Sequence, residues 1–313
     1  MIICSGENLI DFVPNSEDSE SFKACVGGSP LNTAIGLGAM KTPVYFFSRI
    51  SNDFFGKKII SFLKKHNVKT NLIQKTSDKT TLGFISNKKK PEFAFYANQT
   101  ADRNLKHYSF KSTVLKKIML AHFSSISLVL KPGSETYFKM IKSLKNNSLI
   151  SIDPNVRGSL IENKKNFLKR FNQFLKLADI IKLSDEDFNY INSKKNPDKI
   201  IPSWIKKNNI LFVIFTMGEN GSILYTKNFR IYIRSYKVKI KDTVGAGDIY
   251  QAAVINYLYK NKNLSKNKLL NLTKYEWKEC LKFASKAAAI CCTKEGCYPP
   301  TEKEINKSRL TQK

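Results

Sequence analysis

The chain has 313 residues and a mass of 35.7 kDa, which is enough for one large α/β domain or two small ones. A hydrophobic share of 42% and a mean hydropathy of −0.32 exclude a disordered chain and leave no apolar run long enough to span a membrane. The first residues include acidic side chains and no long apolar stretch. We therefore expect no signal peptide, and a cytoplasmic protein whose cysteines stay reduced.

The net charge of +28 raises the question of a nucleic-acid partner. Only seven of the 53 basic residues are arginines, and the lysines are spread along the whole chain. Nucleic-acid-binding proteins commonly gather charge on one face and use arginine for paired contacts with phosphates and bases. We therefore expect a lysine-rich solvated surface and no nucleic-acid partner, although the charge would help to attract anionic small molecules.

Along the chain, short apolar runs alternate with segments of helical periodicity. The runs that read as buried strands are Ile2–Ser5, Val44–Arg49, His122–Ser127, Leu149–Asp153, Ile180–Leu183 and Leu211–Thr216. The helical segments are Pro30–Met40, Gly56–His66, Glu135–Leu144, Asn166–Leu177, Gly245–Tyr259 and Trp277–Cys291. This alternation predicts an α/β fold of three layers, with a mainly parallel central sheet and helices on both faces.

Two stretches break the alternation, because no helical segment follows them. Leu9–Val13 and Leu82–Asn98 read as half-buried strands, and a turn at Lys88–Glu92 interrupts the second. We expect residues of about 9–13 and 82–98 to form a small antiparallel sheet that acts as a lid. No repeat or low-complexity linker divides the chain, so we expect one domain over residues 1–313.

A glycine-containing loop, Asp242–Asp248, precedes a strong helical pattern that begins at Ile249. Such a loop presents free backbone N–H groups at a helix N-terminus, where the helix dipole also favours an anion. Asp248 lies in the first turn, where a carboxylate can take the proton from an attacking hydroxyl group. The loop lacks the lysine of a P-loop, which excludes Walker-type chemistry. A structural turn capped by an aspartate is the alternative interpretation of this pattern.

A second candidate loop, Gly27–Asn32, precedes the helix that is expected to end at Met40. The pair Gly27 and Gly28 allows the chain to approach a ligand closely, and Pro30 suits the first turn of a helix. Asn32 would project from that turn with both a donor and an acceptor, as sugar hydroxyls require. Taken alone, an ordinary loop before a helix explains this stretch equally well.

Together, the two loops resemble the two motifs of the ribokinase-like (PfkB) carbohydrate kinases. Five further segments extend the resemblance in the same order along nearly the whole chain: Gly6–Asp11, Asp153–Arg157, Leu177–Asp187, Thr216–Gly221 and Cys292–Pro300. The second and third of these are similar to the fructokinase branch. The resemblance implies a ribokinase-like fold, a small β-sheet lid, and ATP-dependent phosphorylation of a sugar.

The resemblance also implies residue roles. Asp248 would be the catalytic base, with the N–H groups of Gly245, Ala246 and Gly247 as the anion hole. The sugar would be bound by Asp11, Gly28 and Asn32. On the nucleotide side, the implied residues are Asn155, Arg157, Ser184, Thr216, Gly218 and Gly221. Asp187 would lie near Mg²⁺, although an acid at a helix start explains it too. Asp242 and Thr243 would flank a monovalent cation, usually potassium in this family.

The sequence also departs from the family pattern. Many fructokinase-like members have an arginine where this chain has Ala97, and Asn98 would replace that contact only in part. Because a sugar acid favours a bidentate arginine, its loss favours a neutral sugar. We therefore expect a fructokinase that uses ATP and Mg²⁺ and forms fructose 6-phosphate.

Several alternatives to this assignment remain. The acceptor could instead be ribose, a nucleoside or 2-keto-3-deoxygluconate, or the chain could be a catalytically silent basic binding protein on the same fold. The intact Asp248 and its glycine loop argue against a silent protein. A homodimer formed through the lid is a further expectation, since an exposed small sheet favours a cover.

Overall fold

The computed structural model describes residues 1–15, 21–86, 93–108, 110 and 112–313. Its centre is an eight-stranded sheet with the strand order β14-β13-β12-β11-β10-β9-β1-β4. The strands are β1 (Ile2–Ser5), β4 (Val44–Phe47), β9 (Leu120–Ser124), β10 (Leu149–Asp153), β11 (Ile180–Ser184), β12 (Phe212–Thr216), β13 (Ser222–Thr226) and β14 (Arg230–Ile233). The pairs from β4 to β12 are parallel, whereas β13 and β14 add an antiparallel edge.

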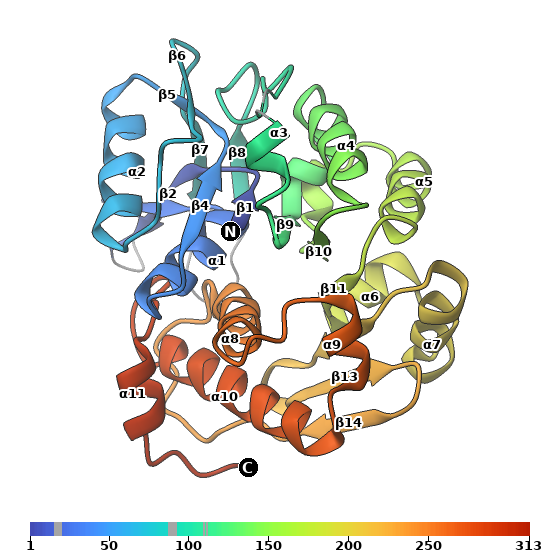
Figure 1. Ribbon diagram of the computed structural model, residues 1–313. Helices are drawn as coiled ribbons and strands as arrows, with labels where there is room; N and C mark the ends of the chain where they lie inside the picture. Colours follow the sequence, from blue (N-terminus) through green and yellow to red (C-terminus); the bar gives the residue numbers. More distant parts are fainter. Residues whose placement is uncertain (16–20, 87–92, 109, 111) are drawn as a thin grey trace.

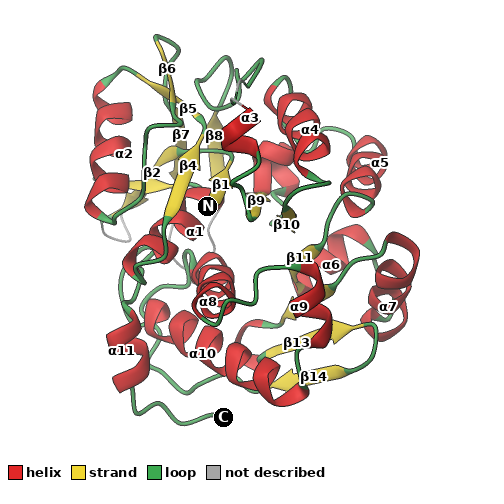
Figure 2. Ribbon diagram, in the orientation of Figure 1, coloured by secondary structure: helices red, strands yellow, loops and turns green. Residues whose placement is uncertain are grey.

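Helices cover both faces of this sheet (Figures 1 and 2). They are α1 (Ser29–Ala39), α2 (Phe54–Lys65), α3 (Ser112–Leu115), α4 (Gly133–Leu144), α5 (Lys164–Leu175), α6 (Asp185–Ile191), α7 (Pro197–Asn208), α8 (Ala246–Lys260), α9 (Lys266–Asn271), α10 (Lys274–Cys292) and α11 (Glu302–Lys307). Side-chain caps start several of them. Thr273, for example, forms a reciprocal capping box with Glu276 at the start of α10.

Two hydrophobic cores follow from the alternation of side chains along each strand. In β1, Ile2 and Cys4 belong to the core that α1, α8 and α10 complete. Ile3 points to the opposite face and belongs to the core that includes α4, α5 and α7. All three side chains are fully buried. The predicted three-layer α/β fold with a mainly parallel central sheet is therefore confirmed.

A separate four-stranded sheet has the order β3-β2-β7-β8. Its strands are β3 (Phe22–Gly27), β2 (Leu9–Pro14), β7 (Thr81–Ile85) and β8 (Phe93–Tyr96). A third sheet pairs β5 (Arg49–Ser51) with β6 (Gln74–Thr76). We call the four-stranded sheet the lid from here on.

The lid differs from the expected antiparallel sheet in two ways. The sequence analysis missed β3, and β2 pairs with β7 in parallel, although β2–β3 and β7–β8 are antiparallel. Strands β2 and β7 are separated by α1, β4 and α2, and such a long crossover permits parallel pairing. The predicted turn at Lys88–Glu92 lies outside the described residues.

Two predicted strands have different limits in the structure. The expected strand Val44–Arg49 is divided into β4 and β5, which join different sheets. The expected strand His122–Ser127 ends at Ser124, and the 3₁₀ turn η1 (Ser125–Leu128) follows it. Apolar periodicity did not reveal these breaks, because the side chains on both sides of each break remain largely buried.

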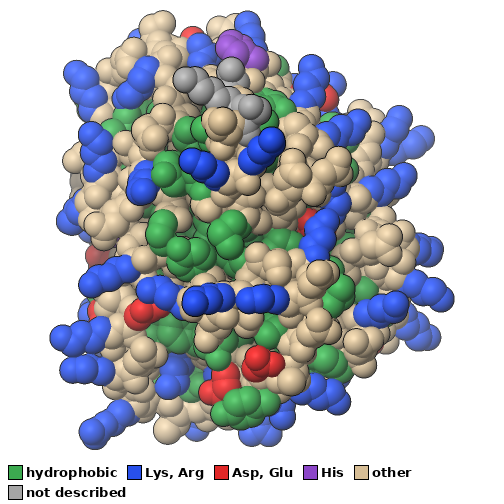
Figure 3. Space-filling model, viewed as in Figure 1, with side chains coloured by type: hydrophobic (Ala, Val, Ile, Leu, Met, Phe, Trp, Pro, Cys, Tyr) green, Lys and Arg blue, Asp and Glu red, His purple; other side chains and the backbone are tan. Residues whose placement is uncertain are grey.

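The surface agrees with the charge pattern of the sequence. Lysine and arginine side chains are scattered over the face that Figure 3 shows, and they do not gather into a single stripe. Within the described ranges, no helix is both long enough and apolar enough to cross a membrane.

Candidate active site

The carboxyl ends of the parallel strands meet at one edge of the central sheet, where open α/β sheets bind their ligands. Ser124, Asp153, Ser184 and Thr216 are the last residues of β9, β10, β11 and β12. The N-termini of α1 and α8 approach the same edge, because Ser29 of α1 contacts both Ser124 and the first turn of α8. Segments far apart in the sequence thus converge here.

Asp248 occupies the centre of this convergence, in the first turn of α8. Ser29 Oγ donates to Asp248 Oδ1 at 2.7 Å, and Asn32 Nδ2 donates to Oδ2 at 2.9 Å. The carboxylate is buried, with 6% exposure, and burial raises its pKa against the lowering effect of these two bonds and of nearby cations. The result is a fixed carboxylate with a raised proton affinity, as a general base requires.

The helix start beside Asp248 has free donors. The backbone N–H groups of Gly245, Gly247 and Asp248 have no acceptor among the described residues. Ala246 N–H, a predicted member of the anion hole, instead donates to Thr243 O at 3.2 Å. Three unpaired N–H groups at the positive end of a 15-residue helix provide donors suited to an anion.

Glycine is required at position 245 for two reasons. Its φ of 76° lies in the left-handed region, and a Cβ atom there would lie 2.3 Å from Cys297 Sγ. Asp242 holds the same loop from the other side, since its carboxylate accepts from Val244 N at 3.0 Å and from Gly296 N at 2.8 Å. The C-terminal segment therefore supports the anion loop directly.

The start of α1 depends on Gly28 and Glu7. Gly28 has a φ of 118°, and a Cβ atom there would lie 2.6 Å from Glu7 O. The buried Glu7 carboxylate accepts from Ser29 N at 3.1 Å and from Ser127 N at 3.3 Å. Burial raises the pKa of Glu7 to about 7. Glu7 thereby positions Ser29, which in turn orients Asp248.

The lid contributes Asp11, which lies between two glycines. Cβ atoms built at Gly27 and Gly83 would lie 2.2 and 2.7 Å from the Asp11 carboxylate oxygens, so the absence of side chains there keeps space around this group. Burial raises the pKa of Asp11 to about 6, and the charge of Arg157 opposes that rise. Arg157 also lowers the pKa of Asp248, so its guanidinium group acts on both the lid carboxylate and the base.

A buried ion pair lies behind the anion loop. Lys182 Nζ of β11 lies 2.8 Å from Asp153 Oδ2 of β10, and the side chains are only 5% and 1% exposed. A Cβ atom at Gly247 would lie 3.2 Å from Lys182 Nζ. Burial alone would lower the pKa of Lys182, but Asp153, Asp187 and Asp248 raise it overall. The ammonium group therefore stays charged beneath the anion loop.

On the expected nucleotide side, several predicted residues already have structural partners. The Ser184 and Asp187 side chains form a capping box that starts α6, and Asp187 Oδ1 also accepts from Val156 N at 2.6 Å. Asn155 Oδ1 accepts from Arg157 Nη1 at 2.7 Å. The alternative interpretation of Asp187, an acid at a helix start, thus describes its contacts in this structure.

The remaining nucleotide-side residues follow β12. Thr216 ends the strand, and its hydroxyl group lies 3.4 Å from Leu183 O. Gly218 and Gly221 bound the 3₁₀ turn η3 (Gly218–Asn220), which leads into β13. No atom lies within 4 Å of a Cβ built at Gly218, so this turn has open space beside it.

The acidic side chains fit a magnesium ion only in part. Within the described part of the chain, no group of three His, Cys, Asp or Glu side chains could hold a metal. Asp153 Oδ2 is paired with Lys182, whereas Oδ1 is buried and has no hydrogen-bond partner among the described residues. Mg²⁺ usually binds one or two carboxylates together with phosphate oxygens and water. Asp153, with free acceptor capacity, and Asp187 therefore fit such an ion.

Asn98 is not among the residues that contact Asp248. Its side chain is exposed, and Asn98 Oδ1 accepts from Arg103 Nη1 at 2.9 Å. The same nitrogen donates to Ala97 O at 3.2 Å. An arginine guanidinium group thus lies against Ala97, but it comes from Arg103.

The sequence analysis assigned no role to five residues that shape the site, which are Glu7, Ser29, Ser124, Asp153 and Lys182. Ser29 and Asp153 belong to segments that carried the resemblance, so they could have been named. Lys182 had one sequence signal, because it is a charged residue inside the apolar run Ile180–Leu183. Ser124 had no signal of its own, because a serine at the end of a buried strand is common.

Comparisons with known proteins agree with this geometry. The model of the pfkB family of carbohydrate kinases matches residues 1–304. The chain is similar to "Probable fructokinase-5" of Arabidopsis thaliana, with 32% identity over 98% of this chain and 96% of that protein. It is also 32% identical to a fructokinase of Rhizobium leguminosarum bv. trifolii, over 87% of this chain and 84% of that protein.

Solved structures show the same fold. The crystal structure of fructokinase with bound ATP from Xylella fastidiosa has a TM-score of 0.90 at 23% identity, over 97% of this chain and 96% of that chain. A Vibrio cholerae O395 fructokinase double mutant, crystallised with fructose, ADP and potassium ion, has a TM-score of 0.85 at 22% identity, over 97% and 96% of the two chains. The chain belongs to the pfkB family of carbohydrate kinases and is an ATP-dependent phosphotransferase with the ribokinase-like fold.

Proposed function

We propose that this sugar kinase transfers the γ-phosphoryl group of ATP to the primary hydroxyl group of fructose and forms fructose 6-phosphate. The observation that carries the proposal is the chemistry of the polar groups around Asp248. Asp248 accepts hydrogen bonds from Ser29 and Asn32, the buried carboxylate of Asp11 is a further acceptor, and Asn32 Oδ1 is a buried acceptor without a partner among the described residues. Such a set requires donors, and the hydroxyl groups of a neutral sugar supply them.

A sugar acid would fit these groups poorly. Its carboxylate would lie near two protein carboxylates, and like charges at close range are costly in a buried site. Fructose rather than another neutral sugar is favoured by the two fructokinase relatives at 32% identity.

The reaction follows from the geometry around Asp248. The sugar hydroxyl group would donate to the Asp248 carboxylate, which takes its proton as the oxygen attacks the γ-phosphorus. The bond from this phosphorus to the bridging β–γ oxygen breaks, ADP leaves, and the proton remains on Asp248 until it passes to solvent. The free N–H groups at the start of α8 and the charge of Lys182 would stabilise the negative charge on the transferred group.

Two further devices support this step. Ser29 and Asn32 hold Asp248 in one orientation, so its proton-accepting oxygens need not reorient during the reaction. Closure of the lid over the sugar would exclude water and limit hydrolysis of ATP. Mg²⁺, when bound, would supply charge neutralisation on the phosphates, with Asp153 and Asp187 nearby.

A coupled ADP-release assay with Mg²⁺, K⁺ and ATP tests the proposal. The acceptor panel contains fructose, ribose, glucose, 2-keto-3-deoxygluconate and adenosine. We expect fructose to give the highest kcat/KM. Preference for another acceptor would support a sugar kinase with that acceptor in place of fructose. No activity with any compound of the panel would favour the alternative of a catalytically silent binding protein.

We also propose that potassium binds beside the anion loop, at Asp242 and Thr243. The support is the exposed Thr243 next to a carboxylate that already organises the loop. Replacement of KCl by choline chloride at constant ionic strength should lower kcat. An unchanged kcat would contradict a potassium site.

A homodimer through the lid is a further proposal, and its support is the apolar outer face of that sheet. Phe12 stacks on Phe84 with ring centroids 4.7 Å apart, and Phe22 and Tyr96 both contact Phe84 edge-on. Phe22 is 39% exposed and Tyr96 is 66% exposed, which leaves an aromatic surface open to a second copy of this chain. Solution scattering should give a dimer mass for the native chain and a monomer mass for Tyr96→Glu. A monomer mass for the native chain would contradict the proposal.

A further inference from the structure

A cavity lies on the outer side of the helices that cover one face of the sheet, and none of its lining residues contacts Asp248. It has a volume of about 580 Å³, within the usual range of small-molecule sites, which is about 300–1,000 Å³. It lies between α5 and α7 and extends to the end of α6. Its lining residues are Asn172, Leu175, Lys176, Asn192, Lys195, Ile200, Ser203, Trp204, Lys207 and Asn208. We propose that this cavity is an effector site for a phosphorylated sugar, whose binding changes the affinity of the enzyme for nucleotide.

The charge of the lining favours an anion. Lys176, Lys195 and Lys207 contribute three cations, and none of the described residues that line the cavity is acidic. None of the three lysines has an ion-pair partner within the described ranges, so their charges are not neutralised by the protein. A phosphate group would supply the missing countercharge.

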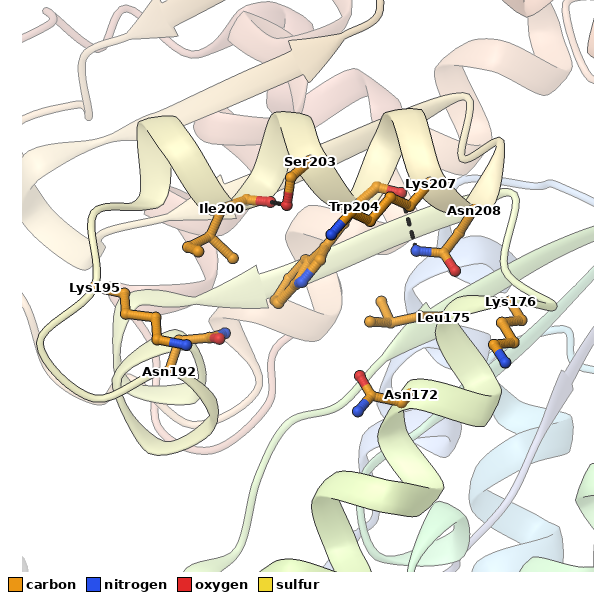
Figure 4. Close-up of a pocket in the computed structure, with 10 residues that line it drawn as sticks. All are labelled: Asn172, Leu175, Lys176, Asn192, Lys195, Ile200, Ser203, Trp204, Lys207 and Asn208. Carbon is orange, nitrogen blue, oxygen red and sulfur yellow. Dashed lines mark hydrogen bonds between the residues drawn. The ribbon is translucent and has the colours of Figure 1, made fainter.

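The uncharged part of the lining favours a sugar. Figure 4 shows the indole ring of Trp204 in the middle of the cavity, with Leu175 and Asn172 facing it from α5. An aromatic ring next to aliphatic side chains provides an apolar surface for the C–H face of a sugar ring. Carboxamide groups such as that of Asn172 both donate and accept, which suits hydroxyl groups.

One donor in the cavity lacks an acceptor. Asn192 Nδ2 is buried and has no hydrogen-bond partner among the described residues. An unpaired buried donor costs about 1–3 kcal/mol. Because this nitrogen is closed to solvent, a ligand oxygen reaches it only after the Asn192 side chain turns toward the cavity, and that contact then recovers this cost. Figure 4 shows the Asn192 side chain extending toward Trp204. The surface lysines alone would not define a site, but this donor adds a specific position for a ligand atom.

Helix α6 connects this cavity to the phosphate side of the active site. It has seven residues, Asp185–Ile191, and Asn192 is the cap residue that follows its last turn. In its first turn, Asp187 accepts from Val156 N and Ser184 N at the sheet edge described above. A ligand that binds Asn192 therefore acts on the helix whose other end orders the loop after β10. The coupling is reciprocal, so nucleotide must change the affinity for the effector by the same factor.

The fluorescence of Trp204 reports binding directly. The chain has two tryptophans, and Trp277 is 1% exposed and packs on Phe212 in the opposite core. Titration of the full chain with glucose 6-phosphate should give a saturable change in emission, which Trp204→Phe abolishes. Isothermal calorimetry gives the affinity for ADP with and without saturating glucose 6-phosphate. We expect a change of about fivefold or more, matched by the reciprocal change in glucose 6-phosphate affinity.

Charge-matched variants on α7 and in the segment before it control this experiment. The double variant Lys195→Gln/Lys207→Gln removes two lining cations, whereas Lys199→Gln/Lys206→Gln removes two exposed cations of α7 that do not line the cavity. We expect the first to weaken glucose 6-phosphate binding at least tenfold and the second to change it less than twofold. Both measurements detect binding, so their outcome does not depend on which sugar the active site phosphorylates.

Several results would overturn the proposal. Equal weakening in the two double variants would show only non-specific attraction to a basic surface. Inorganic phosphate that binds as tightly as glucose 6-phosphate would contradict a sugar ligand. Binding that changes the ADP affinity less than about fivefold would contradict the effector role.

Discussion

The buried pair Lys182–Asp153 provides a sharp test of the electrostatics beneath the anion loop. We consider the substitution Lys182→Met, which keeps the length of the side chain and removes its charge. Asp153 then remains in the core with 1% exposure and no cation within contact. Removing one partner of a buried ion pair costs about 3–5 kcal/mol, because the other charge is left uncompensated.

This cost has a measurable size in thermal unfolding. One kcal/mol shifts the Tm of a domain of this size by about 2 °C, so Lys182→Met should lower Tm by about 6–10 °C at pH 8. The pKa of Asp153 is already raised to about 6 by burial, and loss of Lys182 raises it further. At pH 5 the carboxyl group of the variant is therefore protonated, and the loss of stability should be smaller than at pH 8.

Two controls separate the pair from a general packing defect. Lys182→Met/Asp153→Asn removes both charges, and we expect it to regain at least half of the lost Tm. Lys182 also lowers the pKa of Asp248, so Lys182→Met should move the acid limb of kcat/KM to higher pH. This reasoning would be refuted if the double variant lost as much Tm as the two single substitutions together and if Lys182→Met left the acid limb of the kcat/KM profile at the native pH.

Three more predictions concern the glycine loop and the carboxylates. Gly245→Ala should lower kcat at least tenfold, because its Cβ would lie 2.3 Å from Cys297 Sγ. Gly296→Ala is the control, since Gly296 also has a positive φ but its Cβ would meet nothing within 4 Å; equal kcat in the two variants would contradict the loop geometry. The KM for sugar should rise as pH falls through about 6, because Asp11 becomes protonated there. In Asp11→Asn the KM should depend much less on pH, and a pH profile of KM that this substitution leaves unchanged would exclude Asp11 from sugar binding. Burial raises the pKa of Glu7 from 4.5 to about 7, so its contribution to stability is complete below pH 4.5 and is lost as pH rises through 7. In urea unfolding, Glu7→Gln should reduce the difference in unfolding free energy between pH 5 and pH 8 by about 2–3 kcal/mol, and an unaltered difference would contradict the raised pKa.

The fold could be predicted from the sequence because its strands and helices have clear periods. Leu149–Asp153 matches β10 in both limits, and the helix expected at Gly245–Tyr259 matches α8 to within one residue. The lid was harder. Phe22–Gly27 contains a lysine, an exposed phenylalanine and a glycine, so β3 has neither a buried run nor a strict alternation.

The geometry of the candidate site was predictable where one short segment contains the residues concerned. Asp248 and its loop form such a segment, because the carboxylate lies in the first turn of α8 beside free N–H groups; their roles as base and anion site stay predictions. Contacts between distant segments were not predictable. The bond from Ser29 to Asp248 joins residues 219 positions apart. The cap that Ser184 and Asp187 form is local, and an acid at a helix start was the alternative interpretation of Asp187 from the sequence.

The central claim is that Asp248 is the base that deprotonates the sugar. Asp248→Asn keeps the size of the side chain, so we would measure kcat in the ADP-release assay with fructose and, for the same variant, ADP affinity by calorimetry. The account predicts a fall in kcat of about 10²–10⁴-fold with ADP affinity within threefold of the native value. A variant that keeps the native kcat would remove Asp248 from the mechanism.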